Sequence, residues 1–377
     1  MRLRSSTARS STSTAECSPC CDSNAFHSCF FGQLIERDIM KALVVHGAGD
    51  LRFDELPAPS PEPGQVLVRN THGGICGSDL HYYRHGAVGA FTLREPLVLG
   101  HEVVGRIEND PSGTLPTGTA VAIHPASPCG QCPECGAGVR NVCRNARYFG
   151  SAASCPHTQG GFSEYMTVRQ DQIRVLPATL PLSRAVLAEP LAVGLHALSR
   201  AGGVAGAKVL VCGSGPIGIL AAGAAKAAGA EEVWTTDLLE HPLKIALDVG
   251  VDRTVRIGNE SLPDQYFDVA IEASGASVAV GPTLAAVRRR GVMVQLGMFA
   301  PGPRPAELSA LVAKEIDFRG AFRFDTEFDD AIALLAGTDV LDPVITHTFD
   351  LTDAVAAMDV AADPGSSGKV VLRLSDR

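Results

Sequence analysis

The sequence has no excess of positive charge, because 32 Lys and Arg against 41 Asp and Glu give a net charge of −9. Nucleic-acid phosphates are bound by basic surfaces, so this balance argues against a nucleic-acid partner. Long apolar runs are also missing, and none approaches the roughly 20 residues of a membrane-spanning helix. With 45% hydrophobic and 19% charged residues, the composition is that of an ordinary soluble globular chain, not of a disordered one.

The 11 cysteines show no even framework of spacings. Four lie in residues 1–39, four lie between Cys129 and Cys143, and the rest are isolated from one another. A chain of 377 residues does not need disulfides to complete its core. Metal binding by reduced thiols is therefore the better interpretation, which places the protein in a reducing compartment, the cytoplasm.

Residues 1–39 have neither a helical nor a strand period and are rich in Ser and Thr. Early arginines with one early acid faintly resemble a transit peptide. The Cys and His content could bind metal, but its spacing fits no common zinc finger. A strand pattern begins directly after Met40. We therefore predict that residues 1–39 are a disordered extension or a misassigned start.

The remaining chain predicts an α/β protein of two domains, because its length exceeds what one core usually supports. Short alternating segments between Pro-Gly and Gly-Gly turns predict a β-rich domain over residues 40–190. Alternating strands and helices over residues 191–328 predict a doubly wound parallel sheet. In this second domain we expect a helix over Val278–Arg290, with Arg288–Arg290 in its last turn. Residues 329–377 end in a β-pattern that we expect to return to the first domain.

Four thiols at Cys129, Cys132, Cys135 and Cys143 lie in a segment rich in Gly and Pro. This spacing can surround one tetrahedral Zn²⁺ and leave no ligand position vacant. A closed site has no room for substrate, so its expected role is to fold this lobe.

The stretch from Gly73 to Glu102 contains the ligand types of a catalytic zinc site. Cys76 offers a thiol, and Leu97–Glu102 predicts a strand that brings His101 beside Glu102. Neighbouring strand residues point to opposite faces, so both can face one metal only if the strand bends. A lone strand histidine is more often structural, but here a cysteine and two carboxylates accompany it.

Three further residues could complete this site. Glu189 precedes Pro190 at the head of an apolar helix, where a carboxylate that stabilises the helix dipole is an equal alternative. Ser78 in Ser-Asp is ordinarily a turn or N-cap residue. The functional alternative is that Ser78 bonds a substrate hydroxyl and His81 passes the proton on. Tyr82 could line a pocket or simply pack.

A glycine-rich loop predicts dinucleotide binding in the second domain. It follows the apolar strand Lys208–Cys212 and opens an Ala-rich helix, which is the context that makes this pattern specific. Asp237 ends the next expected strand, 24 residues after Gly213. An acid there accepts bonds from a ribose 2′-hydroxyl and repels a 2′-phosphate, so NAD⁺ is favoured and NADP⁺ is the alternative. The expected cofactor-binding residues are Gly213, Gly215, Pro216, Ile217, Gly218 and Asp237.

From Met40 to the end, the chain is similar to the zinc-dependent medium-chain dehydrogenase/reductase family, and within it to the polyol (sorbitol) dehydrogenase branch. The resemblance implies a GroES-like β-rich catalytic domain, a Rossmann NAD-binding domain, two zinc ions per chain and assembly into homodimers or homotetramers. The segments that carry it are GGICGSDLHYYRHGAVGAF (73–91), PLVLGHEVVG (96–105), the four-cysteine lobe, RYFGSAASCPHTQGGF (147–162), AEPLAVGLHA (188–197), GSGPIG (213–218) and KEIDFRGAFRF (314–324).

The resemblance also implies roles for individual residues. Cys76, His101, Glu102 and Glu189 would surround the catalytic zinc, and Ser78 and His81 would carry the proton. Arginine at 323 could pair with a sugar-acid carboxylate, but polyol-binding relatives carry it too, so it leaves the substrate open. The implied substrate residues are Tyr82, Phe149, Arg323 and Phe324.

The implied reaction moves a hydride from a secondary alcohol of a sugar acid, such as L-idonate, to NAD(P). Sorbitol, xylitol or threonine are the alternative substrates. A catalytically inactive nucleotide-binding relative is the alternative of another class. It is disfavoured because all the expected ligand residues are present.

Overall fold

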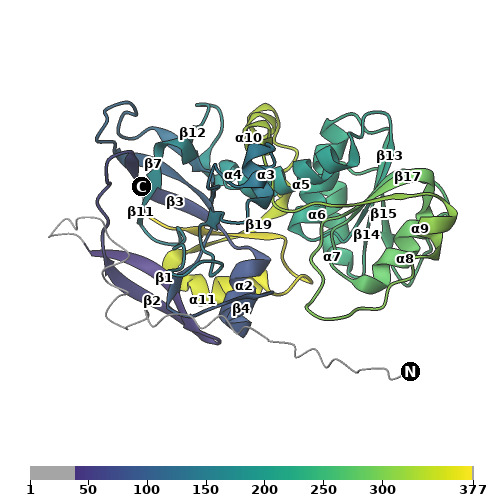
Figure 1. The fold of residues 1–377 in the computed structure, drawn as a ribbon, viewed down its shortest axis with the longest axis horizontal. Coiled ribbons are helices and arrows are strands. Elements are labelled where there is room, and N and C mark those ends of the chain that lie inside the picture. The colour runs from purple at the N-terminus through teal and green to yellow at the C-terminus, as the bar shows by residue number, and fades with distance from the viewer. Residues whose placement is uncertain (1–38, 376–377) are drawn as a thin grey trace, which may run out of the picture.

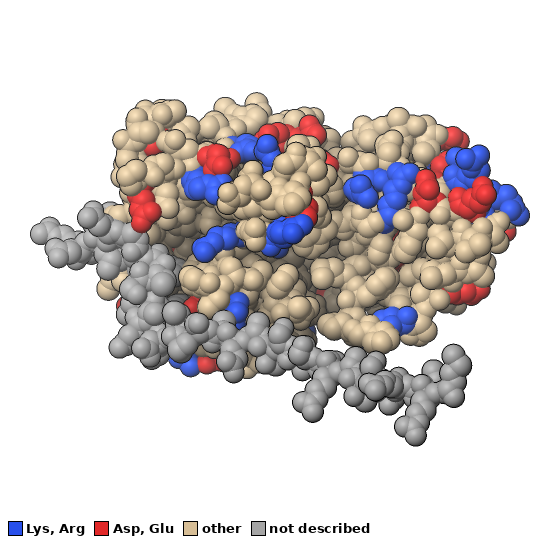
Figure 2. All heavy atoms as spheres, viewed as in Figure 1, with Lys and Arg blue, Asp and Glu red and all other residues tan. Residues whose placement is uncertain are grey.

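The computed structural model describes residues 39–375, and our expectations for the preceding extension lie outside that range apart from Ile39. The chain forms a β-rich part and an α/β part side by side along the long axis, and the C-terminal segment runs back into the β-rich part (Figure 1). Within residues 39–375, no helix combines the length and apolar character needed to cross a bilayer. On the face drawn in Figure 2, Lys and Arg form small groups with Asp and Glu among them.

The first part is built on two sheets with a shared core. One has the order β2-β1-β6, and the other has the order β12-β8-β7-β3-β20-β19, with β11 also paired to β3. Buried side chains alternate along β11, which is the period-2 pattern that the sequence shows there. The strands are β1 Ile39–Gly47, β2 Asp50–Pro57, β3 Gln65–Gly74, β6 Leu97–Val98, β7 Glu102–Asn109, β8 Ala120–Ile123, β11 Tyr165–Arg169, β12 Ile173–Val175, β19 Ile345–Asp350 and β20 Lys369–Arg373.

Short elements complete this part. The helix α2 follows β3 directly, and α11 packs on β20. Two small antiparallel sheets of two strands each are also present, β4 with β5 and β9 with β10. Their bounds are α2 Gly77–His85, β4 Ala87–Val88, β5 Phe91–Thr92, β9 Ala126–Ser127, α3 Pro133–Gly136, η1 Arg140–Val142, β10 Arg147–Tyr148, η2 Gln170–Gln172, α4 Leu182–Ala185, η4 Leu351–Asp353 and α11 Ala354–Ala361. The short helix η3 Asp342–Val344 instead contacts the α/β part.

The second part is a six-stranded sheet of order β15-β14-β13-β16-β17-β18 in which every pair is parallel. Counted along the chain this order is 3-2-1-4-5-6, the doubly wound order that binds dinucleotides where it reverses. The predicted α/β fold class is confirmed. The elements are α5 Ala188–Ala201, β13 Lys208–Cys212, α6 Pro216–Ala227, β14 Glu232–Asp237, α7 Glu240–Asp248, β15 Arg253–Arg256, β16 Phe267–Glu272, α8 Ser277–Ala286, β17 Val287–Gln295, α9 Ser309–Ala313, β18 Asp317–Gly320 and α10 Glu327–Gly337.

The helix predicted over Val278–Arg290 is too long. It ends at Ala286, and Arg288–Arg290 lie exposed in β17 rather than in a last helical turn. The buried ammonium of Lys314 donates to the carbonyls of Leu284, Ala285 and Val287, at 3.1, 2.5 and 2.9 Å. A cation from a later segment therefore satisfies the last carbonyls of α8, which the helix leaves without partners.

Candidate metal centres and cofactor-binding residues

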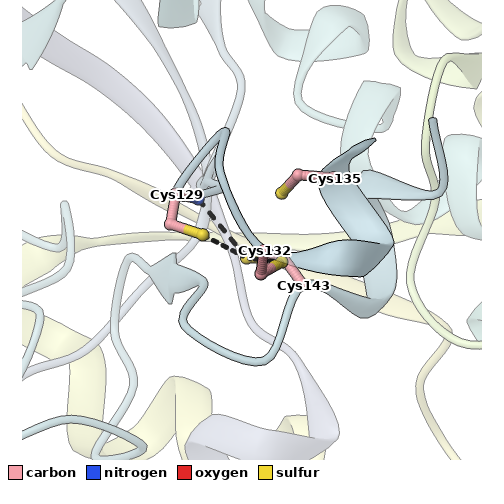
Figure 3. A group of neighbouring side chains, drawn as sticks. All are labelled: Cys129, Cys132, Cys135 and Cys143. Carbon is pink, nitrogen blue, oxygen red and sulfur yellow. Dashed lines mark hydrogen bonds between the residues drawn. The ribbon is translucent and has the colours of Figure 1, made fainter. Parts of the chain in front are cut away.

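The four thiols of the lobe converge around α3 and η1. Their sulfur atoms all lie within 4.8 Å of one another, and all four cysteines are free thiols. Sγ of Cys143 lies 3.6 Å from that of Cys132 and 3.5 Å from that of Cys129 (Figure 3). Four sulfurs at about 2.3 Å from one tetrahedral ion would be about 3.8 Å apart. The donor set and its spacing therefore fit a closed zinc site.

Backbone groups prepare this lobe for an ion. A hydrogen bond from the backbone of Gln131 is the main cause that lowers the pKa of Cys129 to about 6. This direction favours the thiolate, which is the form that binds metal. The ion pair of Arg144 with Glu134, whose Nε–Oε2 distance is 2.9 Å, ties the segment after η1 to α3.

A second cluster of Cys76, His101 and Glu102 has its ligand atoms within 4.8 Å of one another. Cys76 is the N-cap residue of α2, directly after β3. The predicted strand over Leu97–Glu102 is interrupted, because β6 ends at Val98 and β7 begins at Glu102. Gly100 lies between them with a φ of 94°, a conformation that favours glycine. This bend allows an imidazole and the next carboxylate to face one point.

Asp79 holds the two ligand-bearing segments together. Its buried carboxylate accepts hydrogen bonds from the backbone N–H of Cys76, at 2.9 Å, and of Gly100, at 3.3 Å. Burial raises the pKa of Asp79. From the sequence, Asp79 is expected only in a turn or at a helix cap. The sequence does contain a signal for this role, because Asp79 follows the candidate ligand Cys76 by three residues at the start of a helix.

Glu102 is paired with a buried lysine. Nζ of Lys369, on β20, lies 2.6 Å from Oε1 and 2.8 Å from Oε2 of Glu102, and donates to the carbonyl of Ile75 at 3.0 Å. Burial lowers the pKa of Lys369, but Glu102 outweighs it and the net shift is upward. The described structure therefore places Glu102 beside the other two candidate ligands while both its oxygens face a cation. Lys369 was not anticipated from the sequence.

Glu189 lies in the first turn of α5 and is buried. It is not part of the three-residue cluster, but its oxygen Oε1 accepts a hydrogen bond from the hydroxyl of Tyr148 at 2.5 Å. The ring of Tyr148 lies 5.6 Å from that of His101 and 3.9 Å below the guanidinium of Arg323. Tyr148, which had no predicted role, therefore joins the cluster to the loop after β18.

His101 responds to the charges around it. Burial lowers its pKa, but Cys76, through a charge interaction and a hydrogen bond, together with Asp79 and Glu189 raises the pKa of His101 to about 10. An imidazole binds metal in its neutral form, so metal uptake at this cluster releases a proton. The surplus of negative charge that causes the shift is what a divalent cation would neutralise.

Ser78 and His81 lie three residues apart on α2, a spacing that puts them on one helix face. Ser78 is half-buried and His81 is exposed. Burial, with the charges of His85 and Arg84, holds the pKa of His81 below its usual range. His81 is therefore a neutral proton acceptor at pH 7 that faces solvent.

The four predicted substrate residues differ in exposure. Phe149 and Arg323 are half-buried. Tyr82 is 2% exposed, and its hydroxyl accepts the backbone N–H of Ala152 at 2.9 Å. Phe324 is 3% exposed and stacks on Phe328 at 5.5 Å. Tyr82 and Phe324 therefore lie within the hydrophobic core, whereas Arg323 stands over Tyr148.

The glycine loop joins β13 to α6 as its sequence predicts. A Cβ on Gly218 would lie 1.9 Å from the carbonyl oxygen of Gly213, so this position requires glycine for the close turn. A Cβ on Gly215 would meet nothing within 4 Å, which leaves room for a ligand to approach the backbone at the N-terminus of α6. Pro216 and Ile217 begin that helix.

Asp237 ends β14 beside this loop. Its carboxylate accepts the backbone N–H of Ser214 at 2.9 Å and of Leu239 at 3.0 Å. Arg256 is its partner across the β14–β15 pair and is exposed. An acid and an arginine therefore lie together where an adenosine ribose is expected.

Two family models match the chain, the alcohol dehydrogenase GroES-like domain over residues 62–178 and the zinc-binding dehydrogenase over residues 216–337. The L-idonate 5-dehydrogenase (NAD(P)(+)) of Escherichia coli (strain K12) is 41% identical over 315 residues, covering 81% of this chain and 91% of that protein. The sorbitol dehydrogenase of Gallus gallus is 35% identical over 347 residues, covering 88% and 96%. A crystal structure of the Escherichia coli L-idonate 5-dehydrogenase superposes with a TM-score of 0.85 at 38% identity, covering 89% of this chain and 98% of that one.

Proposed function

Because the chain belongs to the zinc-dependent medium-chain dehydrogenase/reductase family, in its polyol and sugar-acid dehydrogenase branch, we propose that it oxidises a secondary alcohol of L-idonate with NAD⁺ or NADP⁺, giving 5-keto-D-gluconate. The observation that carries this proposal is the convergence of Cys76, His101 and Glu102 beside the Tyr148–Glu189 hydrogen bond. These donors fit a catalytic zinc, and the four-cysteine lobe fits a structural one.

When bound, Zn²⁺ would supply Lewis acidity that lowers the pKa of the substrate hydroxyl, and the nicotinamide would take the hydride. The side chains of the protein would hold the metal and transfer the proton. Cys76 and His101 would hold the metal, with Glu102 and Glu189 as further or exchangeable ligands. Ser78 would take the hydroxyl proton and pass it to His81, whose low pKa keeps it neutral. Asp79 would hold both ligand-bearing segments in place.

The positive charge of the Arg323 guanidinium supports an acidic substrate. Its guanidinium stands 3.9 Å from the ring centre of Tyr148, and that ring's hydroxyl reaches Glu189. A sugar acid with its alcohol at the Cys76–His101 cluster could extend its carboxylate to this guanidinium. Phe149, Tyr82 and Phe324 would shape the apolar wall. The alternative is a neutral polyol such as sorbitol or xylitol, which the similarity to sorbitol dehydrogenases favours.

The cofactor-binding residues would be those of the loop Gly213–Gly218 and Asp237. Asp237 would accept bonds from the ribose 2′-hydroxyl of NAD⁺, whereas the neighbouring Arg256 gives a 2′-phosphate a cationic partner. We therefore propose NAD⁺ as the main cofactor and NADP⁺ as a second one.

In this proposal residues 191–328 are the cofactor domain, and residues 40–190 with 329–377 are the catalytic domain. We further propose a cytoplasmic homodimer or homotetramer, as the family resemblance implies.

A substrate panel tests the function. Steady-state rates on L-idonate, D-gluconate, sorbitol, xylitol and L-threonine would be measured with both nicotinamide cofactors on zinc-loaded protein. We expect the highest kcat/KM on L-idonate. A higher value on sorbitol or xylitol would replace the sugar-acid assignment with a polyol one. No turnover of any substrate by protein with two zinc ions would favour an inactive nucleotide-binding relative.

A further inference from the structure

One side chain of the four-cysteine lobe reaches the loop that carries Arg323. Asn141 lies in η1, two residues before Cys143. Its amide nitrogen donates to the carbonyl of Phe322 at 2.9 Å and lies 3.3 Å from Nε2 of His196. Phe322 directly precedes Arg323 in the segment between β18 and α10. The contact therefore joins two segments that are 181 residues apart in the sequence.

The hydrogen bonds around Asn141 determine one arrangement of protons. Nδ1 of His196 lies 2.9 Å from Oε1 of Glu327, so that nitrogen carries the hydrogen and Nε2 is left as an acceptor. The two amide hydrogens of Asn141 then go to Nε2 of His196 and to the carbonyl of Phe322. A flipped amide would place oxygen against oxygen at Phe322, which assigns the orientation. Both amide hydrogens of Asn141 therefore have a hydrogen-bond acceptor.

The same network holds the far end of the loop. The second oxygen of Glu327, Oε2, accepts the backbone N–H of Asp325 at 2.8 Å. The side chains of His196 and Glu327 are only 9% and 10% exposed, so their bond is shielded from water. His196 lies on α5 two turns after Glu189, and residues seven apart share a helix face. The loop is thus tied to the helix that carries a candidate metal ligand.

The conformation of Arg323 needs such support. Its φ is 53°, in the left-handed region that a side chain rarely adopts and that persists only where neighbours hold it. From this backbone position its guanidinium stacks on Tyr148 at 3.9 Å and on Phe322 at 4.9 Å. Asn141 fixes the carbonyl just before this residue, and Glu327 fixes the amide two residues after it.

We propose that Asn141 is a positioning residue that couples the four-cysteine lobe to the substrate site. It fixes the loop Phe322–Asp325 and thereby the guanidinium of Arg323 above Tyr148. This inference rests on the proposed function where it assigns Arg323 to substrate. It gives the lobe a role beyond folding, because the lobe supplies the hydrogen-bond donor that sets substrate affinity.

The test compares three variants of the zinc-loaded enzyme. Asn141→Ala removes the amide, and Asn141→Asp keeps its volume but removes both donors. Gln131→Ala is the matched control, since Gln131 is an exposed amide of the same lobe. Zinc content, NADH affinity, and kcat and KM for L-idonate would be measured for each. Amide hydrogen exchange of residues 318–328 would be followed without substrate, as a readout that does not depend on activity.

For both Asn141 variants we expect two zinc ions, unchanged NADH affinity and kcat, and a KM raised about fivefold to tenfold, the effect of one lost hydrogen bond. Exchange in residues 318–328 should be faster than in the control. A KM and an exchange rate equal to those of Gln131→Ala would overturn the inference, and so would loss of a zinc ion from both variants. If the wild-type enzyme turns over no substrate, the proposed function fails, while the exchange comparison still decides whether Asn141 holds the loop.

Discussion

Lys369 and Glu102 form a buried ion pair next to the candidate catalytic metal ligands. The side chains are 3% and 0% exposed, and Nζ lies 2.6 Å from Oε1. Two charges removed from water at this depth stabilise a structure only in each other's presence. Lys369 lies on β20, so the C-terminal segment supplies the cation that pairs with Glu102 beside Cys76 and His101.

Lys369→Met should strongly destabilise the metal-free protein. The change leaves a buried carboxylate without its partner, a loss of about 3–5 kcal/mol in the free energy of unfolding. Denaturant unfolding of metal-free and zinc-loaded protein would measure it. We expect zinc to restore part of the stability, because Glu102 can then turn to the ion.

The surface pair of Lys226 and Asp252 provides the control. Its side chains are 30% and 36% exposed, and such a pair contributes at most about 1 kcal/mol. If Lys369→Met costs no more free energy of unfolding than Lys226→Met, the pairing of Lys369 with Glu102 does not stabilise the fold.

The fold class was predictable because its signals are local in the sequence. The strand Lys208–Cys212, the glycine loop and the following helix predict a parallel doubly wound sheet, and all pairs of the six-stranded sheet are parallel. The end of α8 was predicted wrongly because it depends on Lys314, a residue distant in sequence that binds the last carbonyls of that helix. Arg288–Arg290 suit a helix end locally, yet tertiary contacts place them in β17.

The candidate site was predictable to the extent that its residues lie in one stretch. Cys76, His101 and Glu102 fall within 27 residues of sequence, and the bend they required is present at Gly100. Lys369 lies 267 residues from Glu102, and no local pattern links a lysine on a terminal strand to a metal ligand. Tyr148 and Asn141 were missed for the same reason, since their partners come from other segments.

Cys76→Ser should abolish turnover and leave the fold intact. Serine is a poor zinc ligand, so we expect one zinc ion per chain in place of two, by mass spectrometry. Circular dichroism and NADH binding should match the wild type, because the cofactor residues lie on the other domain. Activity retained at more than about 1% of wild type would remove Cys76 from the catalytic centre.

Cys132→Ser should instead weaken the lobe. Cys132 is 7% exposed, and a closed thiolate site stabilises its lobe through metal binding itself. We expect one zinc ion, a lower melting temperature and protease cleavage within residues 126–148, where the wild type resists. A variant in which the KM alone changes, with both zinc ions retained, would show that Cys132 is not a ligand of a structural ion.

Arg323→Gln should discriminate sugar acids from polyols. A charged hydrogen bond to a substrate carboxylate contributes about 1.5–3 kcal/mol, so kcat/KM on L-idonate should fall about 10- to 150-fold. The value on sorbitol should change much less, since that substrate has no carboxylate. Equal losses on both substrates would mean that Arg323 acts by holding Tyr148 in place. Arg323→Lys retains the positive charge but not the planar guanidinium. Its kcat/KM on L-idonate should lie between the values of the wild type and of Arg323→Gln.

The pH dependence of kcat/KM tests His81 as the proton acceptor. Burial and the charges of His85 and Arg84 hold the pKa of His81 below 6.5, so its imidazole is neutral at pH 7 and gains a proton as the pH falls. Activity on zinc-saturated enzyme should therefore be constant near neutrality and fall below about pH 6.5. His81→Gln should lower kcat/KM, and that acidic limb should disappear. His85→Gln is the informative control, because the His85 ring lies 5.7 Å from that of His81 and removing its charge raises the pKa of His81. In His85→Gln the fall of kcat/KM at acidic pH should then occur at a higher pH. If this fall stays at the same pH in both variants, the group that titrates is not His81.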